Sequence, residues 1–377
     1  MRILLLNYEF PPMGGGAANA TANIARELVQ LGHHVDVLTS GLPGQSSPET
    51  LHGFTVHRVF SWRKGIHNCG LRGAATFFVS AALKLLTDVR VQSYDIVHCF
   101  FTLPTGGLML VPGVAGKVTY VVSLRGSDVP GYDPFNRTLQ FYHKLLLPVT
   151  RHIWRKAKRV VALSDSLKET ALLTNPAQKI EVIGNGVEVD LFKPPATKRA
   201  PDNTFRLISV TRLIERKGVQ YVLQALRSLN NANVKLLVVG TGSYESHLRQ
   251  LARELRLDDQ VTFYGYCSQE QLPQLYNQSD CFILPSMAES FGIVFAEAMA
   301  SGLPVIGGKT GGIPDLIKDV NGILVEPESI EQIKTAIIKM MSDPGKRSAM
   351  GKANRERVFA HYSWKRVAER YVAIYQP

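Results

Sequence analysis

Short apolar segments of strand length alternate with helix-forming segments along almost the whole chain. This alternation limits the possible folds more than any other feature. The strands predicted in the first half are residues 2–6, 34–38, 96–100, 119–123 and 160–163, with helices such as 17–31 and 74–90 between them. Alternating strands and helices predict a parallel sheet covered by helices on both faces.

The pattern is interrupted once and then restarts. Residues 192–201 combine three prolines with three basic side chains, which is typical of a linker. The strands predicted after it are residues 206–210, 234–239, 261–263, 281–284 and 305–306. A chain of 377 residues is long for one domain and suits two. We therefore predict domains at 1–190 and 204–360, a linker at 191–203, and an amphipathic helix at 364–375.

Composition excludes several classes of protein. Hydrophobic residues make up 45% of the chain, which is enough for two cores, but no run of 18 uncharged apolar residues predicts a membrane-spanning helix. The apolar run of the first seven residues is too short for a signal peptide. The four cysteines show no Cys-x-x-Cys spacing, which argues against a zinc site and a disulfide framework. We therefore expect a cytoplasmic protein.

The net charge of +12 is unevenly distributed. Residues 1–187 hold 19 Lys and Arg against 11 Asp and Glu, whereas residues 188–377 hold 24 against 20. Two basic segments, 58–64 and 151–159, contain Trp62 and Trp154. They are interpreted either as solvated helix faces or as a peripheral contact with an anionic membrane. No nucleic-acid motif accompanies the charge, so we expect no nucleic-acid partner.

The segment after the predicted strand 281–284 carries the most chemistry. A loop with Glu289 and Phe291-Gly292 leads into a predicted helix at 293–300 that ends at Ser301-Gly302. Gly292 lets the backbone approach a ligand closely. The free amides at the helix start, from Ile293 onward, favour an anion.

Two carboxylates accompany this predicted anion site. Glu289 is in the loop, and Glu297 is about one and a half turns into the helix. Carboxylates do not bind phosphate, but they accept hydrogen bonds from hydroxyls. A ligand with both phosphates and many hydroxyls is a nucleotide sugar, which we predict as the substrate.

Two cations follow the predicted strand 206–210. Arg212 is placed at the carboxyl end of that strand, where ligands bind in open α/β sheets, and Lys217 begins the next helix. An arginine can grip a diphosphate with two hydrogen bonds, and a lysine adds a point charge. The pair therefore predicts stabilisation of a diphosphate leaving group.

These segments together resemble glycosyltransferase family 4. The resemblance lies in the spacing Glu289-x7-Glu297 with Ser-Phe-Gly after the first Glu, and in the pattern Arg212-Leu-x-x-x-Lys217-Gly. It implies the GT-B fold, in which two Rossmann-like domains face each other across a cleft. It also implies that the terminal helix, within 361–377, returns to the N-terminal domain.

The resemblance also assigns roles to further residues. It implies that Gly15 and Gly16, which follow Pro11-Pro12, lie over the donor diphosphate, and that Gly265 and Tyr266 lie against the nucleobase. The glycines at 14–16 lack the Gly-x-Gly-x-x-Gly spacing of dinucleotide-binding proteins.

Two positions depart from the family pattern. Thr241 stands between two glycines where the family usually has an acid, and Arg125-Gly126 replaces a frequent His-Gly. An arginine cannot act as a base, but Arg125 can stabilise phosphate or developing charge. Asp128 can hold Arg125 or an acceptor hydroxyl, and a structural ion pair is the alternative. His98 is expected in the core.

The sequence therefore predicts a retaining glycosyltransferase without a bound metal or other cofactor. Its donor is a nucleoside diphosphate sugar bound mostly by the C-terminal domain. Its acceptor is a hydroxyl of a glycan, a lipid-linked molecule or a small molecule, bound mostly by the N-terminal domain. The alternatives are a glycosidase using Glu289 and Glu297, a nucleotide-sugar epimerase on the same fold, and a basic nucleic-acid-associated protein.

Overall fold

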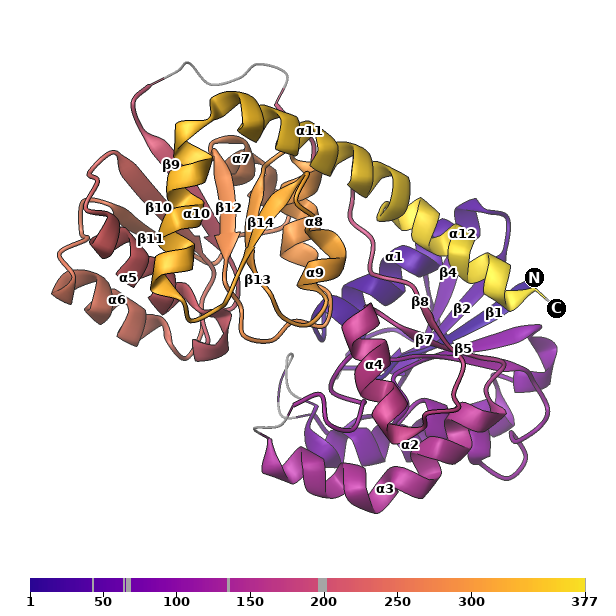
Figure 1. Cartoon of the computed structure of the whole chain (residues 1–377). Coiled ribbons are helices and arrows are strands. Elements are labelled where there is room, and N and C mark those ends of the chain that lie inside the picture. Colours follow the sequence, from indigo (N-terminus) through magenta and orange to yellow (C-terminus); the bar gives the residue numbers. More distant parts are fainter. Residues whose placement is uncertain (43, 64, 66–68, 134–135, 196–201, 377) are drawn as a thin grey trace. The chain divides into compact units, whose positions relative to one another are not determined.

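The computed structural model describes residues 1–42, 44–63, 65, 69–133, 136–195 and 202–376. The chain forms two compact units (Figure 1). Unit 1 comprises Met1–Asn185 and Trp364–Pro377, and unit 2 comprises Gly186–Ser363. The division lies between Asn185 and Gly186, before the predicted linker at 191–203. Residues 196–201 of that linker lie outside the described residues.

Unit 1 is built on an eight-stranded sheet in the order β3-β4-β2-β1-β5-β6-β7-β8. The short edge strand β3 pairs antiparallel with β4, and the other neighbouring strands of this sheet pair in parallel. Its elements are β1 (Arg2–Leu6), α1 (Gly16–Gln30), β2 (His34–Ser40), β3 (Glu49–Leu51), β4 (Phe54–Val59), α2 (Gly70–Thr87), η1 (Val91–Ser93), β5 (Ile96–Phe100), η2 (Gly106–Leu110), β6 (Tyr120–Ser123), α3 (Arg137–Lys156), β7 (Arg159–Ala162), α4 (Asp165–Thr174), β8 (Ile180–Val182) and α12 (Trp364–Tyr375).

Unit 2 contains a six-stranded parallel sheet in the order β11-β10-β9-β12-β13-β14. Its elements are β9 (Phe205–Val210), η3 (Glu215–Lys217), α5 (Val219–Leu229), β10 (Val234–Val239), α6 (Glu245–Glu254), β11 (Val261–Gly265), α7 (Leu272–Asn277), β12 (Cys281–Leu284), α8 (Ile293–Ala300), β13 (Val305–Gly308), α9 (Ile313–Leu316), β14 (Gly322–Val325), α10 (Ile330–Ser342) and α11 (Pro344–His361).

The central strands are apolar on both faces because helices cover both sides of each sheet. All four residues of β12 are buried, as are the last four of β1. Continuous apolar strands of this kind are typical of parallel sheets. The predicted fold class, two α/β units with parallel sheets, is confirmed.

Each sheet has one point at which the strand order reverses. In unit 1 this point lies between β1 and β5, and in unit 2 it lies between β9 and β12. Loops that leave neighbouring strands in opposite directions open a crevice at the carboxyl edge of such a sheet, and ligands bind there. The loops after β9 and β12 contain Arg212 and Glu289, so the topology brings these predicted site segments together.

Helix α12 belongs to unit 1, although unit 2 precedes it in sequence. It packs against α1. Two of its tyrosines enter a buried polar chain, in which His98 Nδ1 lies 2.6 Å from the Tyr375 hydroxyl and Ser123 Oγ lies 3.0 Å from the Tyr371 hydroxyl. Burial holds the pKa of His98 well below its usual value, so this imidazole is neutral. His98 is therefore a core residue, as expected.

The boundaries of several elements differ from those predicted. The helix predicted at 74–90 begins at Gly70 and ends at Thr87, and strands β3, β4, β8 and β14 had not been predicted. Strands β3, β8 and β14 have only three or four residues, which is too few to show a clear periodicity in the sequence. None of the described helices is both long enough and apolar enough to cross a membrane.

Candidate active site

The loops after β9 and β12 approach each other closely in unit 2. Gly218 ends the β9 loop with a φ of +75°, and a Cβ atom there would lie 2.2 Å from the Pro285 carbonyl oxygen. The Met287 amide also donates to the Arg216 carbonyl oxygen at 2.8 Å. Only glycine therefore allows this contact, which sets the distance between the two loops.

Lys217 and Glu289 form an ion pair across these loops. The Lys217 ammonium donates to Oε1 of Glu289, and each side chain is 14% exposed. Two residues predicted to bind neighbouring parts of one ligand therefore lie in direct contact. Arg212 follows β9 on the same edge, and its side chain is exposed to solvent.

The loop after β13 supports Glu289 from the other side. The Gly312 amide donates to the Glu289 carbonyl oxygen at 2.9 Å, and the Thr310 hydroxyl donates to the Ser286 carbonyl oxygen at 2.8 Å. Gly311 has a φ of +53°, and a Cβ there would lie 1.8 Å from the same Glu289 oxygen. The sequence analysis missed this support, although the Gly311-Gly312 pair in the loop after the strand was an available signal.

Helix α8 begins at the predicted anion site. Its N-cap residue, Gly292, has a φ of +84°, no side chain caps the helix, and its first turn contains no acidic residue. A Cβ at Gly292 would lie 2.6 Å from Ile313 Cδ1, so space as well as φ requires glycine. Phe291 is buried beneath the turn and packs against Tyr362, with ring centroids 5.6 Å apart. The backbone from Phe291 to Ile293 can thus present amides to an anion.

Glu297 is buried one and a half turns into α8. Its Oε2 accepts a hydrogen bond from the Tyr276 hydroxyl at 3.1 Å. Burial raises the pKa of Glu297 to about 7, because desolvation outweighs that hydrogen bond. Among the described residues no hydrogen bond reaches Oε1, which leaves this oxygen able to accept one from a ligand.

The Gly-x-Gly turn after β10 seats the Arg212 loop. A Cβ at Gly240 would lie 1.9 Å from the Thr211 carbonyl oxygen, and one at Gly242 would lie 2.1 Å from the Leu213 carbonyl oxygen. Thr241 contributes its carbonyl oxygen, which accepts from the Leu213 amide at 2.9 Å. Because this contact uses the backbone of residue 241, threonine in place of the family's usual acid leaves the structural role of the turn intact.

The predicted base-binding segment ends β11. Gly265 has a φ of +86°, and its carbonyl oxygen accepts from the Gly240 amide at 2.7 Å. The Tyr266 side chain is 79% exposed, so its ring is available to a ligand. This segment therefore shares the carboxyl edge of the sheet with the Arg212 loop.

In unit 1, Gly15 and Gly16 follow β1 and begin α1. Both are exposed, and a Cβ at either would meet no atom within 4 Å. Nothing in unit 1 itself therefore requires glycine at these two positions, in contrast to Gly240 or Gly311. Their predicted role over the donor stays a prediction.

Arg125 is buried at the carboxyl end of β6. Its Nη1 donates to Asn185 Oδ1 at 2.9 Å, and its guanidinium lies 4.4 Å from the centroid of the Phe100 ring. Asp128 accepts from the backbone amides of Arg125 and Thr102, each at 2.8 Å. Asp128 therefore holds the Arg125 turn through the backbone, and burial raises the pKa of its carboxyl group.

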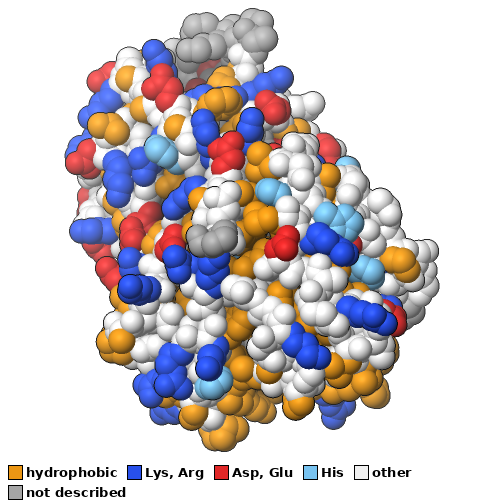
Figure 2. Space-filling model, turned by 90° about the vertical axis from the view of Figure 1, so that its right-hand side faces the viewer, with side chains coloured by type: hydrophobic (Ala, Val, Ile, Leu, Met, Phe, Trp, Pro, Cys, Tyr) orange, Lys and Arg blue, Asp and Glu red, His pale blue; other side chains and the backbone are white. Residues whose placement is uncertain are grey.

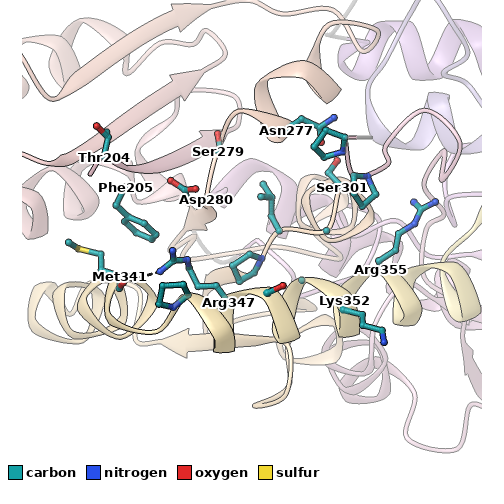
Figure 3. A pocket seen from close by; sticks show the side chains of 18 of the residues that line it. Thr204, Phe205, Asn277, Ser279, Asp280, Ser301, Met341, Arg347, Lys352 and Arg355 are labelled. Atoms are coloured by element: carbon teal, nitrogen blue, oxygen red, sulfur yellow. Dashed lines mark hydrogen bonds between the residues drawn. The ribbon is translucent and has the colours of Figure 1, made fainter. Parts of the chain in front are cut away.

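A cavity of about 940 Å³ lies elsewhere in unit 2 (Figure 3). Thr204, Phe205, Asp280 and Pro304 line it, and they lie at the amino ends of β9, β12 and β13. Arg347 enters it from α11 and lies over the Phe205 ring. The cavity is thus at the opposite edge of the sheet from Arg212 and Glu289.

Comparisons with known families cover both units. Residues 14–191 match the family described as "Glycosyltransferase Family 4", and residues 192–357 match "Glycosyl transferases group 1". The chain belongs to glycosyltransferase family 4. The resemblance in the sequence is confirmed, and the protein is a glycosyltransferase.

Relatives match this glycosyltransferase along its whole length. An uncharacterized glycosyltransferase of Methanocaldococcus jannaschii is 29% identical over 100% of this chain and 98% of its own. A GDP-mannose-dependent alpha-(1-6)-phosphatidylinositol monomannoside mannosyltransferase of Mycobacterium tuberculosis is 28% identical over 97% and 96%. Sucrose-phosphate synthase from Thermosynechococcus elongatus shares the fold, with a TM-score of 0.84, 23% identity, and coverage of 100% and 98%.

Proposed function

We propose that this glycosyltransferase moves a hexosyl group from a nucleoside diphosphate sugar to a hydroxyl, with retention of the anomeric configuration. One observation carries the proposal. The strand-order reversal between β9 and β12 places two cations, a carboxylate and an uncapped helix start at one edge of a parallel sheet. That set of groups matches the phosphates and hydroxyls of such a donor.

The diphosphate is assigned to Arg212, Lys217 and the amides at the start of α8. The Lys217 ammonium has three donors, so it can keep its bond to Glu289 and still donate to a phosphate oxygen. Charge on the diphosphate grows as the glycosidic bond breaks. Cations already held in place stabilise that charge in the transition state, which raises turnover.

The hydroxyls are assigned to the two carboxylates. We propose that Glu289 accepts from the transferred sugar, and that Oε1 of Glu297 accepts from the ribose. The nucleobase is assigned to the backbone near Gly265 and to the exposed ring of Tyr266.

For retention we propose attack of the acceptor on the same face that the diphosphate leaves. Glu289 already accepts from Lys217, which disfavours it as a nucleophile. The acceptor hydroxyl then forms the new bond to the anomeric carbon, and a departing phosphate oxygen takes its proton. Because the two cations and the helix amides supply the positive charge, we propose that the reaction proceeds without a bound divalent ion.

We propose that unit 1 binds the acceptor, with Arg125 and Asp128 as candidate residues and Gly15 and Gly16 contributing to the donor. The acceptor is a hydroxyl of a glycan, a lipid-linked molecule or a small molecule. One relative is named for transfer to a phosphatidylinositol mannoside, which supports a lipid-linked acceptor. We also propose a cytoplasmic location and no nucleic-acid partner.

The test is a screen of purified protein against nucleoside diphosphate sugars, with and without sugar, glycolipid and small-molecule hydroxyl acceptors. We expect one donor to be consumed, with the product linkage in the donor's anomeric configuration by proton NMR. An inverted product would contradict retention. Interconversion of the donor sugar without an acceptor would favour an epimerase, and release of sugar from a substrate lacking a nucleotide would favour a glycosidase.

A further inference from the structure

Helix α2 carries an apolar stripe on its solvent-facing side. Phe77, Ala81 and Leu85 face the core of unit 1. Leu71, Val79, Leu83 and Leu86 are between 45% and 59% exposed. These residues recur at helical spacing, so they form one continuous outer face. No acidic residue occurs anywhere in α2.

Helix α3 carries a second stripe that mixes apolar and basic side chains. Phe141, Leu145 and Val149 follow each other at intervals of four residues, and the first two are 65% and 64% exposed. Arg137, Lys144, Arg151, Arg155 and Lys156 are exposed on the same helix, which again has no acidic residue. At 100° per residue, Arg137, Lys144 and Arg155 lie within about 60° of Phe141 around the helix axis.

An apolar groove of about 520 Å³ joins the two helices. Val79, Leu83 and Leu86 of α2 line one side, Val149 of α3 contributes to the other, and residues from Leu103 to Pro112 form its floor. The stripes of α2 and α3 are therefore one continuous surface, which we name the α2–α3 surface. Figure 2 shows hydrophobic side chains with Lys and Arg beside them along the lower edge, where α2 and α3 lie in Figure 1.

Two exposed aromatic side chains extend this surface. Phe60 and Trp62 are 66% and 64% exposed, and the Trp62 amide donates to Thr76 Oγ1 of α2 at 2.8 Å. The tryptophan of the basic segment 151–159 behaves differently, because Trp154 is buried and its indole nitrogen donates to Thr102 Oγ1. An aromatic anchor for a membrane therefore comes from Trp62 and Phe60, and the sequence could not distinguish the two tryptophans.

We propose that the α2–α3 surface binds an anionic lipid bilayer. Its apolar side chains would enter the boundary between headgroups and acyl chains, and its cations would contact lipid phosphates. Exposed Phe, Trp and Leu side chains beside Lys and Arg are the combination that such an interface favours. The absence of acidic side chains from both described helices removes the main source of repulsion from anionic lipid.

The bilayer fits this surface better than a protein partner does. A protein interface usually buries its cations against carboxylates at fixed positions. In an anionic bilayer the lipids move laterally, so their phosphates can pair with cations that are scattered over a surface. The cations here are distributed along α3 and are exposed. The proposal does not depend on the identity of the donor or on the chemistry proposed for unit 2.

The first test measures sedimentation of the full chain with vesicles of phosphatidylcholine alone and of phosphatidylcholine with 30% phosphatidylglycerol. We expect binding to the anionic vesicles, and we expect it to weaken as salt rises because salt screens exposed charges. Equal binding to both vesicles, or binding to neither, would overturn the proposal.

Two pairs of variants locate the surface. Phe141→Ser with Leu145→Ser should weaken binding at least about 10-fold, because two exposed apolar side chains that would enter the bilayer are lost. Lys144→Gln with Arg155→Gln should weaken it about 5-fold for each cation at low salt, from roughly 1 kcal/mol for each charge. Thermal melts and circular dichroism confirm that each variant is folded.

Matched controls lie in unit 2. Phe359 on α11 is 59% exposed, so Phe359→Ser removes a comparable aromatic side chain. Lys346→Gln with Lys352→Gln removes the same charge as the basic pair. Controls that reduce binding as much as the α2–α3 variants would overturn the assignment. So would a Phe141→Ser, Leu145→Ser variant that binds vesicles normally but loses a dimer seen by light scattering, since the occupant would then be a second copy.

Discussion

The Lys217 ammonium donates to the Glu289 carboxylate across 72 residues of sequence. Each group holds the other in place before any ligand is present. A pair this close to an uncapped helix start positions a cation for phosphate and a carboxylate for hydroxyls with little reorganisation. The predictions below depend mainly on this arrangement.

Arg212→Ala and Lys217→Ala should each lower turnover by about 100-fold or more, because each removes a cation from the developing charge of one diphosphate. The double variant should be less than additively worse, because both residues act on the same ligand. Steady-state kinetics on the three folded variants measures this. Near-normal turnover in either single variant would break the diphosphate assignment. Arg216→Ala, one residue before Lys217, is the control for loss of charge in this loop.

Glu289→Ala should lower turnover while nucleoside diphosphate binding persists. The carboxylate is assigned to the transferred sugar, which the free nucleotide lacks. Calorimetry with the nucleotide, together with rates of transfer, separates these effects. A Glu289→Ala variant that transfers sugar at the normal rate would show that Glu289 does not bind the sugar. If the variant no longer bound the nucleotide, Lys217 would need Glu289 to hold it in position.

Nucleotide-sugar affinity should rise between pH 6 and pH 8. With a pKa of about 7, Glu297 changes from mostly protonated to mostly ionised in this range, and the ionised form is the better acceptor for ribose hydroxyls. We expect a rise of about 5- to 10-fold if only the ionised form binds. The stability of the ligand-free protein should change in the opposite direction. Because the pKa of Glu297 is raised in the folded state, this group's contribution to the free energy of unfolding is lost as pH rises from 4.5 to about 7.

Glu297→Gln tests this assignment, since affinity should then be independent of pH over that range. Glu297→Ala should weaken nucleotide sugar and free nucleotide together, by about 1.5–3 kcal/mol for a hydrogen bond to a charged group. Unchanged nucleotide affinity in a folded Glu297→Ala variant would place Glu297 outside the site.

Gly311→Ala should nearly abolish transfer, because the new Cβ would displace the Glu289 carbonyl oxygen, which lies 1.8 Å from its position. Gly32→Ala is the control. Gly32 also has a positive φ, +83°, but a Cβ there meets no atom within 4 Å. The control should cost only about 1–3 kcal/mol of stability from backbone strain. Equal loss of activity in both variants would mean that strain, and not the displaced loop, is responsible.

Transfer should continue in excess EDTA. The positive charge assigned to the leaving group comes from Arg212, Lys217 and the helix amides. Rates measured with EDTA, and again after adding back magnesium or manganese, check this. A rate that falls in EDTA and returns with one of the metals would contradict transfer without a divalent ion.

The sequence predicted those parts of the site that depend on patterns within a short segment, such as an apolar strand followed by a charged residue. Arg212 and Glu289 each follow a short apolar strand, so strand periodicity alone placed them at the carboxyl edge. The fold class followed from the same periodicity. The resemblance to a known family then linked the two segments, which no local pattern could do.

The parts that were not predicted depend on contacts between distant segments. The support of Glu289 by Gly311 and Gly312 depends on how the β13 loop lies against the β12 loop. Trp154 and Trp62 both stand among basic residues, and only packing shows that the first is buried. Likewise, the Arg125 side chain donates to Asn185, 60 residues away, whereas the hydrogen bond between Arg125 and the neighbouring Asp128 comes from the Arg125 backbone amide.

The last helix of unit 1, α12, follows the whole of unit 2 in the sequence, so it is synthesised after unit 2. During translation, unit 2 can therefore complete its sheet while the His98 side of unit 1 still lacks Tyr371 and Tyr375. Until α12 is in place, the buried polar chain around His98 lacks its two tyrosines, and α1 lacks the helix that packs against it. Unit 1 is therefore the first unit to begin synthesis and the last for which all residues are present.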